Sequence, residues 1–269
     1  MPAERLLELC HQARRTGQRP VFGLNGPVGA GKTTLAAQLQ QQLAAAGVQL
    51  AVASIDDAYL PWPQRLQQLQ GNPFGVTRVP PGSHEPALLS AAIDHWRADP
   101  AGLLELPRFD KRLRNGDGDR TEPWRGCADA LLLEGWLVGC RPVSQQQLQR
   151  WYEPEPTQKA WLQRCNQALE IYEPLWDRLD LLLLLWPISW QLPRRWRFQA
   201  EARQRRRGGG WMSAAALDAL VQASLKSLPP QLYQRPLLQR ADWVRVLDRR
   251  RQPHWQGSGG AALRWLDQS

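Results

Sequence analysis

GPVGAGKTT, at residues 26–34, matches the pattern G-x-x-x-x-G-K-[ST] of a loop that binds phosphate. In such a loop the glycines let backbone N–H groups turn toward phosphate oxygens. The lysine places a positive charge on the β and γ phosphates, and the hydroxyl group after it binds Mg²⁺. We therefore predict a nucleotide site for ATP and Mg²⁺, with Thr33 as one metal ligand. Its residues are Gly26, Pro27, Val28, Gly29, Ala30, Gly31, Lys32, Thr33 and Thr34.

The segments on either side of this loop have the order strand, loop, helix. VFGL at 21–24 is a short apolar run typical of a buried strand, and TLAAQLQQQLAAA at 34–46 has helical composition and spacing. The N-terminus of that helix adds its positive dipole end to the phosphate site. A chance glycine-rich turn is the alternative, and the flanking segments argue against it. We predict an α/β fold, the three-layer sandwich of P-loop NTPases, with a parallel sheet flanked by helices.

Length and composition are typical of a soluble protein. A chain of 269 residues suits one large α/β domain or two small ones. No apolar run approaches the roughly 20 residues of a membrane span, and residues 4–15 have the pattern of an amphipathic helix rather than of a signal peptide. The four cysteines occur singly, which indicates neither a zinc site nor a disulfide framework. We expect a cytoplasmic protein with no membrane partner.

The chain is basic, with a net charge of +9 and a pI near 10.0. This charge fits nucleic acid, anionic metabolites or an arginine-rich proteome equally well. The 14 tryptophans do not have the spacing of RNA-binding motifs. Charge alone does not choose among these partners, and the tryptophan spacing makes nucleic acid the less favoured one; the expectation of a small anionic substrate rests on the loops described below. A basic, ATP-regulated RNA-binding protein is the alternative from another functional class.

Acidic residues follow two of the predicted strands. VQLAVASI at 48–55 is followed by Asp56 and Asp57, and ADALLLE at 128–134 ends in Glu134. In open parallel sheets, ligands bind beyond the carboxyl ends of the strands. Glu134 has the position of a Walker B acid, so we predict it as a second metal ligand. The alternatives are that the Asp-Asp pair only caps a turn and that a buried strand ends in glutamate by chance.

Two predicted loops carry candidate substrate contacts. Residues 61–83 are rich in Pro, Gly and Gln and form the first loop, and a helix follows over 87–96. His84 and Glu85 then stand at the first turn of that helix, where they either cap it or contact substrate. The second loop follows a short strand at 103–106 and contains Asp110, Lys111 and Arg120. Its mixed charges suit a grip on a small anion, and a solvated charged loop is the alternative.

Seven arginines fall within residues 194–207, ahead of three glycines at 208–210. This density predicts a helical lid over about 190–212 that closes arginines on a triphosphate, with the glycines as its hinge. A solvated basic helix or an RNA-binding arm is the alternative. Beyond the lid we predict a helix over 212–227 capped by Ser213, a last strand over 243–247, and a loosely ordered tail over about 249–269.

Taken together, these motifs resemble the glycerate kinases of photosynthetic organisms and fungi, which are relatives of phosphoribulokinase, uridine kinase and bacterial pantothenate kinase. The motifs are GPVGAGKTTL (26–35), SIDDAYL (54–60), PPGSHE (80–85), FDKRLRNGDGDR (109–120), LLLEGWLVG (131–139), YEPLWDRLD (172–180) and WRFQAE (196–201). The resemblance implies a single P-loop kinase domain over residues 1–269. It implies phosphorylation of D-glycerate to 3-phosphoglycerate with ATP, in photorespiratory glycerate salvage.

The resemblance also implies roles for individual residues. Asp56 matches the acid that takes the proton of the acceptor hydroxyl, while Lys32 and Arg197 stabilise the charge of the γ-phosphate. The residues expected around the acceptor are Asp57, Tyr59, His84, Glu85, Asp110, Lys111 and Arg120. The sequence departs from the family pattern at Ala58, Glu85 and Arg112. Pantothenate, a nucleoside and ribulose phosphate remain alternative acceptors, and the sequence predicts no oligomeric state.

Overall fold

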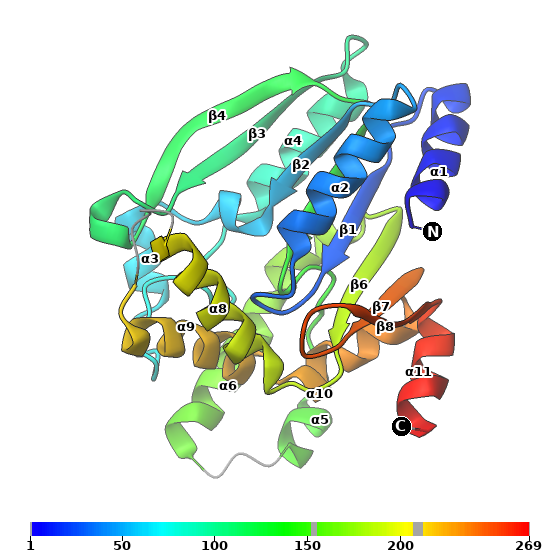
Figure 1. The fold of residues 1–269 in the computed structure, drawn as a ribbon. Helices are drawn as coiled ribbons and strands as arrows, with labels where there is room; N and C mark the ends of the chain where they lie inside the picture. Colours follow the sequence, from blue (N-terminus) through cyan, green and yellow to red (C-terminus); the bar gives the residue numbers. More distant parts are fainter. Residues whose placement is uncertain (1, 152–154, 207–211, 269) are drawn as a thin grey trace.

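The structure is a computed structural model that describes residues 2–151, 155–206 and 212–268. Its centre is a six-stranded sheet with the strand order β2-β5-β1-β6-β7-β8 (Figure 1). The strands are β1 (Val21–Asn25), β2 (Leu50–Ser54), β5 (Ala130–Gly135), β6 (Leu181–Pro187), β7 (Trp243–Leu247) and β8 (Pro253–Gly257). The first five in this spatial order are parallel, and β8 is antiparallel to β7. The predicted α/β class with a mostly parallel sheet is confirmed.

Helices cover both faces of this sheet, which is why its strands are so apolar. Every residue of β1 and of β6 is buried. Helices α1 (Pro2–Thr16) and α2 (Lys32–Ala45) pack on one face. Helices α4 (Pro86–Ala98) and α6 (Pro156–Ala168) belong to the core on the other face. Strand β1 lies between β5 and β6, so the loop that follows it leaves the middle of the sheet.

Shorter elements complete the described parts of the chain. The other α-helices are α3 (Trp62–Gln68), α5 (Gln145–Arg150), α7 (Glu173–Trp176), α8 (Leu192–Arg206), α9 (Ala214–Ser227), α10 (Pro230–Tyr233) and α11 (Gly259–Gln268). The 3-10 helices are η1 (Ile55–Ala58), η2 (Arg114–Gly116), η3 (Leu169–Tyr172) and η4 (Arg235–Gln239). Ser213 caps α9 as predicted, since its hydroxyl accepts a hydrogen bond from the N–H of Ala216. None of the helices described here is both long and apolar enough to cross a bilayer.

The charged segment at 107–120, predicted as a loop, is the tip of a hairpin, and only 111–118 form its turn. Strand β3 (Leu103–Asp110) pairs with the antiparallel β4 (Asp119–Cys127) in a separate two-stranded sheet. Leu104 and Leu106 are wholly buried, whereas the charged residues of both strands are exposed or partly exposed. The prediction was wrong because charged residues on largely exposed strands were taken for the mark of a loop. Helix α3 likewise lies inside the predicted loop at 61–83.

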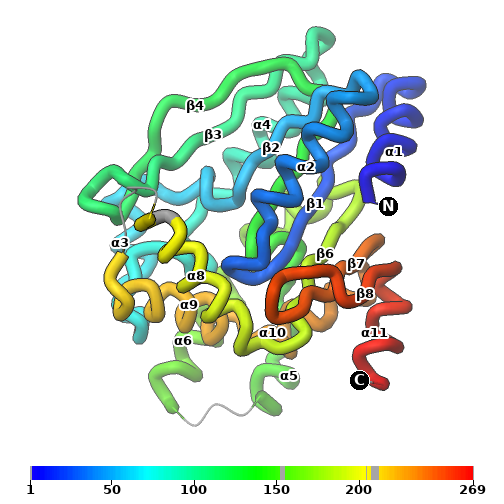
Figure 2. Tube along the Cα trace, viewed as in Figure 1, coloured from blue at the N-terminus to red at the C-terminus, as the bar shows by residue number. Residues whose placement is uncertain are grey.

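The tail is ordered, which contradicts the prediction of a loosely ordered segment over 249–269. Strand β8 pairs with β7, and α11 packs beside it (Figure 2). Ala262 is wholly buried, and Leu263, Trp265 and Leu266 pack against the same core. The prediction was wrong because it followed the many glycines and arginines of this segment and gave too little weight to its apolar residues. The predicted lid helix corresponds to α8, and its predicted hinge at 208–210 lies outside the described residues.

Candidate active site

The phosphate-binding loop occupies the turn between β1 and α2, as predicted. Gly31 has φ 93° at the N-cap of α2, a conformation that favours glycine. Gly29 has φ 76°, and a Cβ there would lie 2.8 Å from the backbone nitrogen of Arg197. The loop therefore lies directly against the backbone of α8, and the glycine permits that approach.

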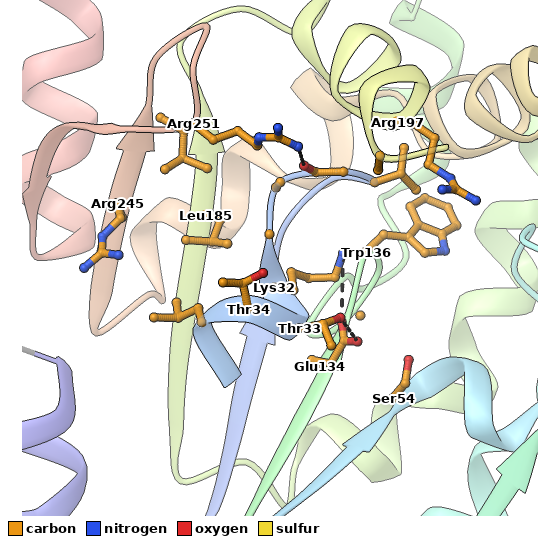
Figure 3. Close-up of a pocket in the computed structure, with 18 of the residues that line it drawn as sticks. Lys32, Thr33, Thr34, Ser54, Glu134, Trp136, Leu185, Arg197, Arg245 and Arg251 are labelled. Atoms are coloured by element: carbon orange, nitrogen blue, oxygen red, sulfur yellow. Dashed lines mark hydrogen bonds and ion pairs between the residues drawn. The ribbon is translucent and has the colours of Figure 1, made fainter. Parts of the chain in front are cut away.

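A pocket of about 1300 Å³ opens over this loop (Figure 3). Residues 28–35 form its floor, and Asp56, Lys111, Glu134 and Arg197 lie on its walls. Arg245 on β7, with Arg250 and Arg251 from the turn before β8, lines its far end. Both polar and apolar surfaces and many cations are present, so the pocket suits a polyanionic ligand that carries an apolar base.

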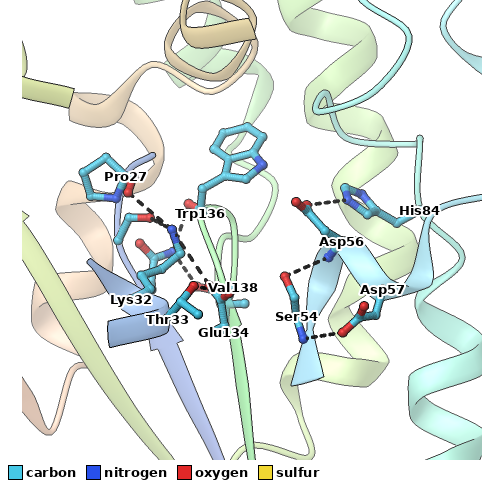
Figure 4. A network of polar contacts seen from close by, with 12 residues as sticks. Pro27, Lys32, Thr33, Ser54, Asp56, Asp57, His84, Glu134, Trp136 and Val138 are labelled. Carbon is cyan, nitrogen blue, oxygen red and sulfur yellow. Dashed lines mark hydrogen bonds and ion pairs between the residues drawn. The ribbon is translucent and has the colours of Figure 1, made fainter. Parts of the chain in front are cut away.

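Lys32 folds back over the loop that precedes it. Its Nζ donates hydrogen bonds to the carbonyl oxygens of Gly26 at 3.0 Å and Pro27 at 3.3 Å, and lies 3.9 Å from Oε2 of Glu134 (Figure 4). Burial lowers the pKa of Lys32, and the charge of Glu134 opposes that shift. The ammonium group is thus placed at the phosphate site and is not part of the apolar core.

Thr33 and Glu134 present two oxygen donors beside Lys32. The hydroxyl of Thr33 lies 3.4 Å from Oε1 of Glu134, at the carboxyl end of β5. Burial raises the pKa of Glu134, and Lys32 opposes this. A hydroxyl and a carboxylate are the ligand types that Mg²⁺ takes together with phosphate oxygens, so these residues fit the predicted metal. No cluster of three or more His, Cys, Asp or Glu side chains suited to a metal occurs in the described ranges.

Asp56 faces this group from the other side of the pocket (Figure 4). It lies in η1, directly beyond the carboxyl end of β2, and the N-cap hydroxyl of Ser54 accepts a hydrogen bond from its N–H. Its Oδ2 lies 2.6 Å from Nζ of Lys111, and its Oδ1 lies 3.7 Å from Nε2 of His84. Burial raises the pKa of Asp56, but Lys111 and His84 outweigh it and hold that pKa well below its usual value.

Several predicted acceptor residues are held by neighbours instead of lining the pocket. Asp57 accepts a hydrogen bond from the N–H of Ser54 and pairs with Arg108 at 2.8 Å, so it closes a capping box. This is the turn-capping alternative, and it applies to Asp57 but not to Asp56. Tyr59 is wholly buried beneath the ring of His84.

The charged residues around the hairpin also pair with one another. Glu85 makes no capping bond to α4 and instead pairs with Arg120 at 2.5 Å. Arg120 also donates to the carbonyl oxygen of Tyr59. Asp110 pairs with Arg112, which lowers the pKa of that carboxyl to about 2. Of the seven residues expected around the acceptor, Lys111 alone lines the pocket.

The arginines of α8 divide between the pocket and the outer surface. Arg197 and Arg203 line the pocket, and Arg197 lies 3.1 Å from the buried carboxylate of Glu201. Arg194 points elsewhere, because it pairs with Asp218 of α9 at 2.5 Å. The helix does not present a uniform basic face. Sequence reasoning missed the three arginines of β7 and the following turn, since no local motif marks them as part of a nucleotide pocket.

The fold and the site together define a P-loop phosphotransferase. The loop between β1 and α2, the acid at the end of β5 and the acid beyond β2 meet at one edge of a parallel sheet, which is the edge where such sheets bind ligands. These are the parts that phosphoryl transfer requires.

Comparisons with known proteins agree with this class. No family model matches the chain. The uncharacterized kinase mug58 of Schizosaccharomyces pombe is 26% identical over 214 residues, which cover 74% of this chain and 76% of that protein. A D-glycerate 3-kinase structure from Cryptococcus neoformans var. grubii is similar with a TM-score of 0.79 and 25% identity, over 96% of this chain and 97% of that chain.

A second solved structure shares the fold alone. Phosphoribulokinase from Rhodobacter spheroides has a TM-score of 0.51 and 11% identity, over 86% of this chain and 71% of that chain. The resemblance to glycerate kinases and their P-loop relatives that the sequence predicts is therefore confirmed. The similarities support phosphoryl transfer and nucleotide binding by the P-loop.

Proposed function

We propose that this protein transfers the γ-phosphate of ATP to the terminal hydroxyl of D-glycerate, giving 3-phosphoglycerate and ADP. The observation that carries the proposal is Asp56, which faces Lys32 across the pocket with the cation of Lys111 beside it. The similarity to the D-glycerate 3-kinase of Cryptococcus supports the choice of acceptor. In this proposal residues 1–269 act as one kinase domain, with α8 as its lid.

Phosphoryl transfer depends mainly on alignment and on neutralisation of charge. Lys32 and Arg197 would contact the phosphate oxygens, and Asp56 would accept the proton of the acceptor hydroxyl. Thr33 and Glu134 would hold Mg²⁺, which supplies further positive charge to the phosphates when bound. In this proposal α8 covers the pocket during the reaction and excludes bulk water from these groups, which is the purpose of a lid in such an enzyme.

Lys111 connects acceptor binding to the strength of the base. In this structure Lys111 pairs with Asp56 and contributes to its low pKa, which keeps the carboxylate ionised but makes it a weak base. The carboxylate of D-glycerate is an alternative partner for the same ammonium group. Once Lys111 turns to the substrate, the pKa of Asp56 rises, so the base becomes stronger when the acceptor is in place. The predicted second cation, Arg120, is already paired with Glu85.

The test is an assay of the purified protein with Mg-ATP and D-glycerate, followed by identification of the product. We expect 3-phosphoglycerate, and we expect the neutral analogue glycerol to be a very poor substrate because it lacks the carboxylate. Pantothenate, uridine and ribulose 5-phosphate serve as competing acceptors in the same assay. If one of them is phosphorylated while D-glycerate is inert, the glycerate assignment is wrong and the phosphotransferase class stands.

A further inference from the structure

Behind Asp56 lies a row of buried aromatic and polar groups that the mechanism above does not use. His84, two residues before α4, is 1% exposed. Its ring stacks on Tyr59 with the centroids 4.3 Å apart and the planes at 16°. Backbone hydrogen bonds on both sides of His84 join its segment to the end of η1. The imidazole is therefore held in one place relative to Asp56.

Tyr172, the last residue of η3, contacts the other side of this imidazole. Its hydroxyl lies 2.8 Å from Nδ1 of His84 and accepts a hydrogen bond from the N–H of Gly82 at 3.1 Å. A buried hydroxyl proton needs an acceptor. Within the described parts of the chain, Nδ1 is the one acceptor that this proton reaches. Tyr172 therefore donates and Nδ1 accepts.

The neighbouring hydroxyl does not change this assignment. Ser83 Oγ lies 3.5 Å from Nδ1, but it donates its own proton to the carbonyl oxygen of Pro80 at 2.6 Å. Burial also raises the pKa of Tyr172, so its phenol stays protonated and remains a donor at neutral pH.

The imidazole carries a single proton, and that proton lies on Nε2. Burial lowers the pKa of His84. The negative charge of Asp56 opposes this downward shift, and the positive charges of Lys111 and Arg65 reinforce it. Since Nδ1 accepts from Tyr172, the remaining ring proton is on Nε2. This nitrogen is fully buried with no hydrogen-bond partner at normal distance, and Oδ1 of Asp56 lies 3.7 Å away. Hydrogen bonds around a catalytic base are often long before substrate binds and shorten in the complex.

We propose that Tyr172 is a positioning residue for phosphoryl transfer: it fixes the tautomer of His84, whose Nε2–H holds Oδ1 of Asp56 while Oδ2 faces Lys111 and the acceptor. In the opposite tautomer, the lone pair of Nε2 would face the carboxylate and repel it. The inference rests on the proposed function only in that Asp56 is the base. It assigns a catalytic purpose to a hydroxyl that lies outside the pocket.

The experiment compares Tyr172→Phe with Tyr233→Phe in the full-length chain. Tyr233 is a matched control, because it is also buried and also donates its hydroxyl to a side chain, Oδ1 of Asn166 at 2.9 Å, in another part of the core. The tautomer of His84 is measured from the ¹⁵N chemical shifts of its ring nitrogens, which His84→Gln assigns. Turnover is measured with Mg-ATP and D-glycerate.

We expect the wild type and Tyr233→Phe to show a neutral imidazole protonated on Nε2. Tyr172→Phe should lose this single tautomer. Its kcat should fall about 10- to 100-fold with the KM for ATP unchanged, because a small displacement of the catalytic Asp56 lowers the rate by about that much. A wild-type His84 protonated on Nδ1 overturns the proposal, as does a Tyr172→Phe variant that keeps either the tautomer or the wild-type kcat. If D-glycerate is inert with the wild type, the proposed function fails, while the ¹⁵N shifts still decide this inference.

Discussion

Asp56 and Asp57 are adjacent carboxylates that the structure places in different surroundings. Asp56 lines the pocket beside Lys111, whereas Asp57 caps η1 and pairs with Arg108. We expect Asp56→Asn to lower kcat by about 10²–10⁴-fold, the usual contribution of a general base. ATP binding should be preserved, because Asn keeps the shape and lies away from the P-loop. Steady-state kinetics and ATP titration measure the two effects.

Asp57→Asn should act on stability instead. It replaces the carboxylate that pairs with Arg108 by a neutral amide, whose oxygen can still accept from the N–H of Ser54. Loss of such a partly exposed ion pair costs up to about 1 kcal/mol. Denaturant unfolding of both variants separates the two carboxylates. Similar losses of kcat in Asp56→Asn and Asp57→Asn would contradict the division of roles.

We expect His84 to make the stability of the protein depend on pH. Burial lowers its folded-state pKa below the value of about 6.5 that it has in the unfolded chain. As pH falls below about 6.5, the unfolded chain binds a proton that the folded protein refuses. The free energy of unfolding therefore falls by up to about 1.4 kcal/mol per pH unit, until the folded pKa is reached.

Urea unfolding between pH 5 and 8 measures this dependence. His84→Gln should remove the slope, and His254→Gln, at an exposed position, should retain it. Equal slopes in the wild type and His84→Gln would show that another group is responsible.

At the scale of residues, the sequence predicts what a contiguous motif specifies. Lys32, Thr33 and Glu134 lie together as expected, because a P-loop and a strand end fix their backbone positions. The pairing of charged side chains could not be predicted. Glu85 is engaged by Arg120 and Asp57 by Arg108, and both arginines stand on a hairpin far along the chain.

Helix α8 is the element whose arginines the sequence predicts as a lid. Arg197 lines the pocket, and Gly29 packs against its backbone, so its guanidinium lies close to the phosphate site. We expect Arg197→Ala to lower kcat more than it raises the KM for ATP, if the contact strengthens in the transition state. Removal of one such donor typically costs about 10²–10³-fold in kcat.

Arg194→Ala is the control for this helix, because Arg194 pairs with Asp218 on the side away from the pocket. It should leave both parameters near their wild-type values. A rise in the KM for ATP alone would limit Arg197 to nucleotide binding.

The β3–β4 hairpin brings Lys111 to the acceptor side of the pocket. Lys111→Ala should raise the KM for D-glycerate about 10- to 100-fold, since a hydrogen bond to a charged group contributes about 1.5–3 kcal/mol. Arg112→Ala is the neighbouring control, because Arg112 is exposed and pairs with Asp110 outside the pocket. The KM for D-glycerate of each variant, measured at saturating ATP, tests the assignment. An unchanged KM in Lys111→Ala would remove Lys111 from the acceptor site.

Elements were predicted well where they are apolar and poorly where they are charged. The central strands are short hydrophobic runs, and the sequence locates them because burial on both faces leaves few polar positions. Strand β3 is fully buried only at Leu104 and Leu106 and β4 at no position, so their charges resembled those of a loop. Strand β8 has no fully buried residue at all. Only its pairing with β7 reveals it.

At the scale of the whole molecule, the pocket joins segments from both ends of the chain. Arg251 donates to the carbonyl oxygen of Gly29 at 3.4 Å and to Gln199 of α8 at the same distance. The turn before β8 is thus in contact with both the P-loop and α8. No local pattern predicts such a contact between residues 222 positions apart.

This arrangement predicts that the tail contributes to stability and to nucleotide binding separately. A chain that ends at Asp248 loses the β8 partner of β7 and the packing of α11, so its melting temperature should fall well below that of the full chain. Arg251→Ala keeps these elements and should melt near the wild type.

With Mg-ATP at about 100 times Kd, the wild type should gain roughly 2.7 kcal/mol, or about 5–10 °C. We expect a smaller gain in Arg251→Ala, because its guanidinium lines the pocket. Thermal unfolding with and without Mg-ATP measures all three chains, and a truncated chain that melts like the full one would show that the tail is dispensable to the fold.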